Sequence, residues 1–192
     1  MGSITELIHP NKDVDGLSPV NMGRLASRTS EPTFYPCTPL GIIKLCEHYH
    51  LSMNKRRVVV VGRSEIVGVP MALMLNRQDA TVTLCHSKTV GLSEILKNAE
   101  VVIAAVGKPG IIRSDWIQPG AIVIDVGINR THNGRGESKL VGDIDPNMAK
   151  MASAWTPVPG GVGPMTVAML VHNVFRSALR WHNIQDEELK GN

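Results

Sequence analysis

The chain has 192 residues, of which 43% are hydrophobic and 19% are charged, and its net charge is +3. This balance is typical of a globular protein with a sizeable core, and the length suits one domain or one domain plus part of another. The mild charge and the 4% aromatic content argue against a nucleic-acid partner. Three cysteines without a C-x-x-C spacing indicate reduced, mostly buried thiols in an intracellular protein. Since no apolar run approaches the roughly 18 residues of a membrane span, we predict no membrane partner and a cytoplasmic location.

The predicted elements begin after a polar stretch. Residues 17–36 are rich in Pro, Ser, Asn and Thr without sustained periodicity, which predicts a loop. A helix is predicted to open at Pro39 with Thr38 as its cap. The valines at 58–61 then form a continuous β-branched run that is typical of a buried parallel strand.

Strands and helices alternate from there. Further strands are predicted at 80–84, 101–106 and 121–126, and helices after Pro70 and at 92–98. Residues 109–119 read as a loop with one helical turn, 129–139 as a hairpin or surface loop, and Asp145 as the start of a short helix. The last helix is predicted from Pro164 to about His182. Strands separated by helices predict right-handed βαβ units and an α/β fold with a Rossmann-type parallel sheet.

The stretch VVVVGRSEIVGVPMA has the form of a strand, a glycine turn and a helix start, which is where α/β sheets bind dinucleotides. Its spacing departs from G-x-G-x-x-G, because Gly62 is followed by Ser64 and then Gly68. A lone glycine pattern is weak evidence, since many α/β proteins need a glycine there for steric reasons alone.

The next strand end bears on the kind of dinucleotide. An NAD site places an acidic residue about 20 positions on, at the end of that strand. The sequence there is Leu-Cys-His-Ser-Lys at 84–88, and Arg63 lies in the turn itself. A missing acid and a nearby arginine favour NADP over NAD; the alternative is that Arg63 and Lys88 are solvated surface charges.

Two further strand ends carry glycine. Gly107 and Gly127 each follow a predicted buried strand, so we expect them to allow close approach of the nicotinamide half of the cofactor. Asp125 is interpreted as a structural hydrogen-bonding residue rather than a catalytic acid.

The segment TPVPGGVGPMT at 156–166 combines three prolines and three glycines. Such a rigid, side-chain-poor wall is expected beside a flat ligand rather than in a simple turn. Thr166 is expected either to cap the last helix or to bond the ligand. The histidines are scattered without metal-ligand spacing, so no metal is predicted.

Several blocks together resemble one family: KDVDG, PCTPLG, VVVGRSEIVGVP, ATVTLCHSKT, AAVGKPG, GAIVIDVGIN, LVGDID and TPVPGGVGPMTVAML. They are similar, in order from about residue 9 to residue 180, to the bifunctional methylenetetrahydrofolate dehydrogenase/cyclohydrolase (FolD) family. The resemblance implies NADP-dependent oxidation of 5,10-methylenetetrahydrofolate to the methenyl form, hydrolysis of that form to 10-formyltetrahydrofolate, and a homodimer formed through the cofactor domain.

The resemblance also implies site residues. The implied cofactor contacts are Gly62, Arg63, Ser64, Ile66, Ser87, Gly107, Gly127, Ile128 and Thr166, with Arg63 and Ser87 near the adenosine phosphate. The implied folate contacts are Asp15, which would bond the pterin ring, and the loop residues Pro159, Gly160, Gly161, Val162 and Gly163. Asp13 is interpreted as surface or structural.

One departure from the family pattern concerns catalysis. The family carries a Tyr-x-x-x-Lys motif whose lysine is the key catalytic residue, and no such motif occurs in these 192 residues. We therefore expect a chain lacking most of the N-terminal catalytic domain, with residues 1–37 as its remnant, 38–158 as the cofactor domain, and 159–192 as a folate-side loop and returning helix. That helix is expected to expose an apolar face. Activity is expected to be impaired; the alternative is a catalytically inactive, dimerising NADP-binding module.

Overall fold

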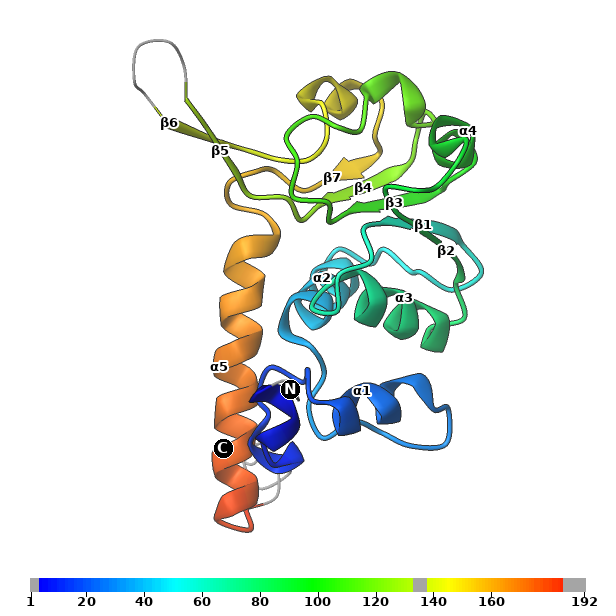
Figure 1. The fold of residues 1–192 in the computed structure, drawn as a ribbon. Helices are drawn as coiled ribbons and strands as arrows, with labels where there is room; N and C mark the ends of the chain where they lie inside the picture. The colour runs from blue at the N-terminus through cyan, green and yellow to red at the C-terminus, as the bar shows by residue number, and fades with distance from the viewer. Residues whose placement is uncertain (1–3, 133–137, 185–192) are drawn as a thin grey trace.

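A five-stranded parallel sheet forms the centre of the structure, a computed structural model that describes residues 4–132 and 138–184. Its strands are β1 (Arg57–Val61), β2 (Thr81–Cys85), β3 (Val101–Ala104), β4 (Ile122–Asp125) and β7 (Ala154–Trp155). They lie in the order β2-β1-β3-β4-β7, and all neighbouring pairs are parallel. The predicted α/β fold with a Rossmann-type parallel sheet is therefore confirmed (Figure 1).

Helices cover both faces of this sheet (Figure 1). Helices α2 (Cys37–His48) and α3 (Gly68–Arg77) pack on one face, against Val58 and Val60. Helix α4 (Leu92–Lys97) and the short 3-10 helices η3 (Ser114–Trp116) and η4 (Pro146–Lys150) lie on the other face, which holds Val59 and Val61. Successive strand residues point to opposite faces, so the run of four valines supplies both cores and reads as continuously apolar.

Most predicted elements are present with ends shifted by one or two residues. Helix α2 begins at Cys37 rather than Pro39, and the last helix, α5 (Val162–Trp181), begins two residues before Pro164. The predicted hairpin is formed by β5 (Asn129–His132) and β6 (Ser138–Val141), which pair antiparallel, and its connecting residues lie outside the described part. The short edge strand β7 was not predicted, because two residues carry no periodicity.

The predicted loop over 17–36 is wrong in its first half. Residues Pro19–Ala26 form helix α1, preceded by the 3-10 helices η1 (Ile4–Leu7) and η2 (Pro10–Lys12). Ser18 is the N-cap of α1, and its hydroxyl accepts the amide of Asn21 at 3.3 Å. A capping serine followed by proline in the first turn is a helix start signal, so the polar composition of this stretch was misread as a loop.

Helix α5 runs away from the sheet, and the N-terminal segment lies beside its far half (Figure 1). The buried Asn173 joins the two, because its Nδ2 donates to the carbonyls of Val14 at 2.8 Å and Tyr35 at 3.1 Å. The other side of α5 is an exposed apolar stripe made of Val167, Leu170, Val171, Val174 and Phe175. The expectation that this helix exposes apolar surface is confirmed.

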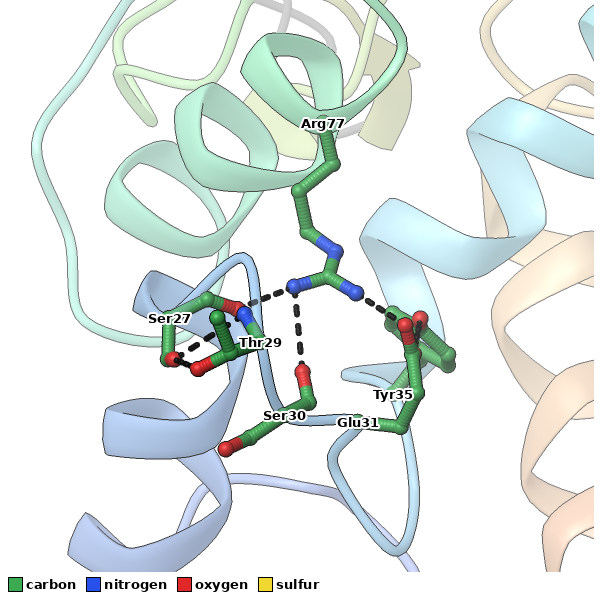
Figure 2. Close-up of polar contacts among 6 residues, drawn as sticks. All are labelled: Ser27, Thr29, Ser30, Glu31, Tyr35 and Arg77. Carbon is green, nitrogen blue, oxygen red and sulfur yellow. Dashed lines mark hydrogen bonds and ion pairs between the residues drawn. The ribbon is translucent and has the colours of Figure 1, made fainter.

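Arg77, at the end of α3, holds the N-terminal segment against the part of the chain that forms the parallel sheet (Figure 2). Its Nη1 donates to the carbonyls of Ser27 and Ser30, and its Nη2 pairs with Glu31, which also accepts the hydroxyl of Tyr35. Burial and the neighbouring carboxylate of Glu31 both raise the pKa of Tyr35. The segment after α1 is therefore held against the helix that follows the first glycine turn.

Candidate functional site: the carboxyl edge of the sheet

The candidate site lies where the parallel strands end. Because all five strands run the same way, the loops that follow them meet at one edge of the sheet. Strand β1 is flanked by β2 on one side and by β3 on the other, so the chain adds one strand on the first side of β1 and then crosses to the second side. In open α/β sheets ligands bind outside the carboxyl ends at this switch point, which here places the β1 loop at the centre.

The β1 loop is packed closely against its neighbours. Gly62 has φ +122°, and a Cβ there would lie 2.1 Å from the carbonyl oxygen of Ala105. A Cβ on Gly68, the first residue of α3, would lie 1.9 Å from the carbonyl oxygen of Gly62. Both glycines are thus required by the chain's own packing, as the steric interpretation of the sequence proposed for Gly62.

The same loop also offers hydrogen-bond donors. The backbone amides of residues 63–66 have no acceptor in the described part of the chain, and these residues are exposed. Ser64 stabilises the turn, because its hydroxyl accepts the amides of Val67 at 3.2 Å and Gly68 at 3.4 Å. Consecutive free amides before a helix N-terminus form a concave donor surface suited to an anion.

Arg63 and Ser87 reach this edge from adjacent strands. Val61 of β1 pairs with Cys85 of β2, and the two predicted residues each follow two positions later. Both are exposed, and the turn after β2 is shaped by His86, whose amide is accepted by the hydroxyl of Thr89. Arg63 and Ser87 therefore occupy equivalent positions after two neighbouring strands, at the same edge of the sheet as the loop of residues 63–66.

The turn after β3 is organised by a residue that the sequence analysis missed. Asp143 is fully buried, and its carboxylate accepts the amides of Val106 at 2.6 Å, Gly107 at 2.9 Å and Lys108 at 3.0 Å. It also accepts the Nδ2 of Asn129 at 2.8 Å. The carboxylate thus ties the β3 turn to the first residue of the hairpin.

Gly127 packs against Asp143. It is buried, and a Cβ there would lie 2.2 Å from Oδ1 of Asp143. The glycine makes room for this carboxylate, and its contact with a cofactor stays a prediction. Gly107 leaves space beside the β3 turn, since its φ is +70° and a Cβ there would meet nothing within 4 Å.

Asp125, at the end of β4, is a structural residue, as interpreted from the sequence. Its carboxylate accepts the amides of Gly127 at 2.9 Å, Asp143 at 3.0 Å and Ile144 at 2.9 Å. Burial raises the pKa of Asp125, and these backbone donors act in the opposite direction. Its own amide donates to the hydroxyl of Thr156, which joins β4 to the start of the proline-glycine segment.

The proline-glycine segment closes one end of this edge. Pro159 follows a cis peptide bond and is exposed, as is Gly160 with φ +100°. The side chain of Ile128 reaches the opening of α5, 3.5 Å from the position of a Cβ on Gly163. Val162 instead turns its side chain into the core, so only its backbone is available to a ligand.

Asp15 lies beside Cys37, the first residue of α2. Its exposed carboxylate neighbours the thiol of Cys37, and burial, followed by this carboxylate, raises the pKa of Cys37 to about 12. The next residue, Thr38, bonds Thr166 of α5 through its hydroxyl at 3.0 Å. Thr166 does not cap α5, whose N-cap is Gly161. The N-terminus of α2 thus brings the two predicted positions Asp15 and Thr166 near each other.

Asp13 has the structural role that the sequence allowed. It is buried and accepts the amides of Leu17 at 3.1 Å and Ser18 at 2.8 Å, together with Nδ2 of Asn21 at 2.7 Å. Within the described residues, no hydrogen bond or ion pair joins Asp15 to the β1 or β3 loops. Asp15 and Thr166, near the N-terminus of α2, therefore form a second group of predicted residues beside the one on the β1, β2 and β3 loops.

Comparison with known proteins shows which family has this arrangement of residues. The family model described as "Tetrahydrofolate dehydrogenase/cyclohydrolase, NAD(P)-binding domain" matches residues 36–182. The chain belongs to the tetrahydrofolate dehydrogenase/cyclohydrolase family. The FolD resemblance seen in the sequence is thereby confirmed, and the predicted cofactor class is confirmed as far as NAD(P).

Relatives cover nearly all of the chain but are longer. A bifunctional protein FolD of Thermus thermophilus is 53% identical over 176 residues, which are 92% of this chain and 60% of the relative. The chloroplastic FolD 4 of Arabidopsis thaliana is 52% identical, over 95% of this chain and 52% of the relative. A Trypanosoma brucei FolD structure, complexed with NADP and an inhibitor, has a TM-score of 0.85 and 41% identity over 92% of this chain and 61% of that one. The chain thus spans about 60% of the Thermus relative's length.

Proposed function

We propose that the chain binds NADP at the carboxyl edge of its sheet and serves the oxidation of 5,10-methylenetetrahydrofolate that its family carries out. The observation that carries the proposal is the exposed loop of residues 63–66, whose amides face no acceptor in the described part of the chain. It lies at the switch point of a domain that the NAD(P)-binding family model matches. The NADP named with the Trypanosoma structure agrees with this choice of cofactor.

The proposed cofactor contacts follow from this placement. The pyrophosphate lies on the β1 loop at Gly62, Ser64 and Ile66, and the adenosine 2′-phosphate lies between Arg63 and Ser87. The remaining proposed contacts line the other half of the groove: Gly107, Gly127 through its backbone, Ile128 and Thr166. Titration of the chain with NADP and with NAD, followed by intrinsic fluorescence or calorimetry, tests the proposal. Binding of neither cofactor would refute it.

Replacement of Arg63 by alanine is expected to weaken NADP binding roughly 10- to 100-fold, because a hydrogen bond to a charged group is typically worth ~1.5–3 kcal/mol. NAD lacks the 2′-phosphate, so its affinity should stay within about two-fold. Dissociation constants for both cofactors give the measurement. Lys88→Ala is the matched control, since it removes an exposed cation from the same edge. An unchanged NADP/NAD preference in R63A would show that Arg63 is only a surface charge.

The folate side of the proposal rests on the neighbouring group of residues. We propose that Asp15 bonds the pterin ring and that the loop from Pro159 to Gly163 lies against the folate, which Val162 can contact only through its backbone. Asp15 is exposed at the edge of α2, next to the helix that this loop begins. In the family reaction the methenyl product is then hydrolysed to 10-formyltetrahydrofolate, and we propose both steps as the function that this chain serves.

The second candidate function is a catalytically inactive NADP-binding module. It is favoured by one observation: the 192 residues contain no Tyr-x-x-x-Lys, because Pro39 follows Tyr35 by four positions and Met53 follows Tyr49. NADP binding without turnover of 5,10-methylenetetrahydrofolate would support the module.

The proposed domain division is residues 1–37 and 159–192 around the cofactor domain at 38–158. It is supported by the course of α5 away from the sheet and by the exposed apolar stripe along that helix. Leu25 of α1 nevertheless belongs to the core beneath the sheet, so the first segment packs on the cofactor domain in this structure. We propose that the stripe contacts the additional domain that the longer relatives contain.

We also propose a homodimer formed through the cofactor domain. Strand β7 is an open edge of the sheet, and beside it lies an apolar pocket of about 560 Å³ between α2 and β4. Trp155 and Tyr49 line this pocket with 49% and 65% of their surfaces exposed. Exposed aromatic side chains beside the free edge of a sheet are typical of an interface.

A charge at the centre of this surface is expected to prevent the dimer. Trp155→Glu would place a carboxylate against the apolar pocket, which is costly to bury without a partner. Light scattering should then show a monomer where the parent chain is a dimer. Val167→Glu, on the stripe of α5, is the control and should leave a dimer through β7 intact. A dimer in W155E would place the interface elsewhere.

A cytoplasmic location is also proposed. No helix among the described residues has both the length and the apolar character that crossing a membrane requires. The cytoplasmic C-1-tetrahydrofolate synthase of Schizosaccharomyces pombe is 48% identical over 184 residues, whereas the Arabidopsis relative is chloroplastic.

A further inference from the structure

A buried carboxylate lies beneath the cofactor groove and has no part in the contacts proposed so far. Both oxygens of Asp143 are occupied: Oδ2 accepts the amides of Val106 and Gly107, and Oδ1 accepts Lys108 and the side chain of Asn129. All four partners are donors, which fits an ionised carboxylate because that form only accepts hydrogen bonds. The turn after β3 is therefore wrapped around a buried negative charge.

The two loops beside the switch point consequently differ in polarity. Each backbone amide has one hydrogen to donate, so the turn at 106–108 has no amide left for a phosphate. The β1 loop at 63–66 has amides without an acceptor among the described residues. Gly107 is exposed, and the space beyond its Cα is open. The β3 turn thus suits an uncharged or cationic flat group, and the β1 loop suits an anion.

A second carboxylate holds Asp143 in place. Asp125 accepts the amides of Asp143 and Ile144, and a Cβ on Gly142 would lie 2.0 Å from Oδ2 of Asp125. The backbone at Asp143 and Ile144 is therefore held in place by the carboxylate of Asp125. The carboxylate of Asp143 accepts four donors at 2.6–3.0 Å. Because its own backbone is held by Asp125, this carboxylate determines the conformation of the turn at 106–108.

Resting on the proposed NADP binding, we propose that Asp143 is a positioning residue that assigns the two halves of the cofactor to different loops. By occupying the amides of the β3 turn, it leaves the phosphates to the β1 loop and the nicotinamide half to Gly107. Its charge also favours the oxidised nicotinamide, which is a cation, over the reduced ring, which is neutral. Because Asp143 is fully buried, its charge is screened less by water than a surface charge would be.

Asp143→Asn in the 192-residue chain tests this assignment with three ligands: 2′,5′-ADP, oxidised NADP and reduced NADP. The substitution keeps the size of the side chain, removes the charge, and turns an NH2 group toward backbone donors. Affinity for oxidised NADP should fall roughly ten-fold, equivalent to about 1.4 kcal/mol, with a smaller fall for reduced NADP. Affinity for 2′,5′-ADP, which reaches only the Arg63 end, should stay within about two-fold.

Asp13→Asn is the matched control. Asp13 is likewise a buried carboxylate that accepts two amides and one asparagine side chain, but it holds the start of α1. Its loss should lower the melting temperature without changing the ratio of the affinities for the two NADP forms. Asn129→Ala removes one donor from Asp143 but keeps its charge, so the affinity for both NADP forms should fall by a smaller factor with little change in their ratio and with the 2′,5′-ADP affinity within about two-fold; this variant serves if D143N does not fold.

The outcomes separate the two proposals. A parallel loss of all three affinities in D143N or in N129A, or an unchanged ratio of oxidised to reduced NADP in D143N, would overturn the role of Asp143. Failure of the unsubstituted chain to bind either NADP form would instead overturn the proposed function.

Discussion

Gly62→Ala is expected to destabilise the fold by on the order of 3 kcal/mol or more, a large part of the 5–15 kcal/mol that keeps a typical domain folded. Two penalties add at this position. The backbone has φ +122°, which side chains rarely adopt, and the new Cβ would lie 2.1 Å from the carbonyl oxygen of Ala105. The nearest atoms all belong to the backbone of Ala105 and not to a flexible side chain, so relief requires β1 and β3 to separate at their ends. Urea unfolding followed by circular dichroism gives the measurement.

Gly23→Ala is the control for this substitution. Gly23 lies inside α1, and a Cβ there would meet nothing within 4 Å. Since alanine is favoured over glycine in helices, the free energy of unfolding should rise by roughly 0.5–1 kcal/mol. A Gly62→Ala variant as stable as the parent chain would show that the loop can move away from β3. The steric explanation for Gly62 would then be wrong.

The fold was predictable where the signal is carried by consecutive residues. The valines at 58–61 and the apolar runs at 101–104 and 121–124 identify buried strands, because parallel strands with two covered faces contain few polar residues. Strand β7 has only two residues. Helix α1 begins at Pro19 after its N-cap Ser18, and a serine followed by a proline also occurs in turns. Short elements are stabilised by their neighbours, and that information is absent from their own sequence.

The site was predictable in its parts but not in its connections. Gly62 and Arg63 were found from a strand end and from a missing acid, whereas Ser87 came from the resemblance to the family. Asp143 is 36 residues from Gly107 in sequence, and no local pattern indicates that its carboxylate would hold the β3 turn. Asn173 reaches Val14 across 159 residues in the same way. Asp143 is the first aspartate of the block LVGDID, which contributed to the family resemblance but did not indicate what this side chain contacts.

The largest functional effect is expected for the hydrolysis of 5,10-methenyltetrahydrofolate. The chain alone should catalyse it about 10²–10⁴-fold more slowly than the Thermus thermophilus FolD, because a positioned acid-base group typically contributes that factor. The family's catalytic lysine belongs to a Tyr-x-x-x-Lys motif, which these 192 residues do not contain. The decrease in methenyltetrahydrofolate absorbance under matched conditions gives the rate.

The same experiment decides between an impaired enzyme and an inactive module. NADP binding should persist in the chain, since its proposed contacts lie on the loops after β1, β2, β3 and β4 and on α5, and not on the lysine motif. Slow but measurable hydrolysis that Asp15→Ala reduces further would identify an impaired folate enzyme, because Asp15 touches only the proposed folate side. No hydrolysis above the uncatalysed rate, with intact NADP binding, would identify the module. A rate near that of the Thermus FolD would show that a group in this chain replaces the lysine, and the exposed carboxylate of Asp15 at the edge of α2 would be the first to test.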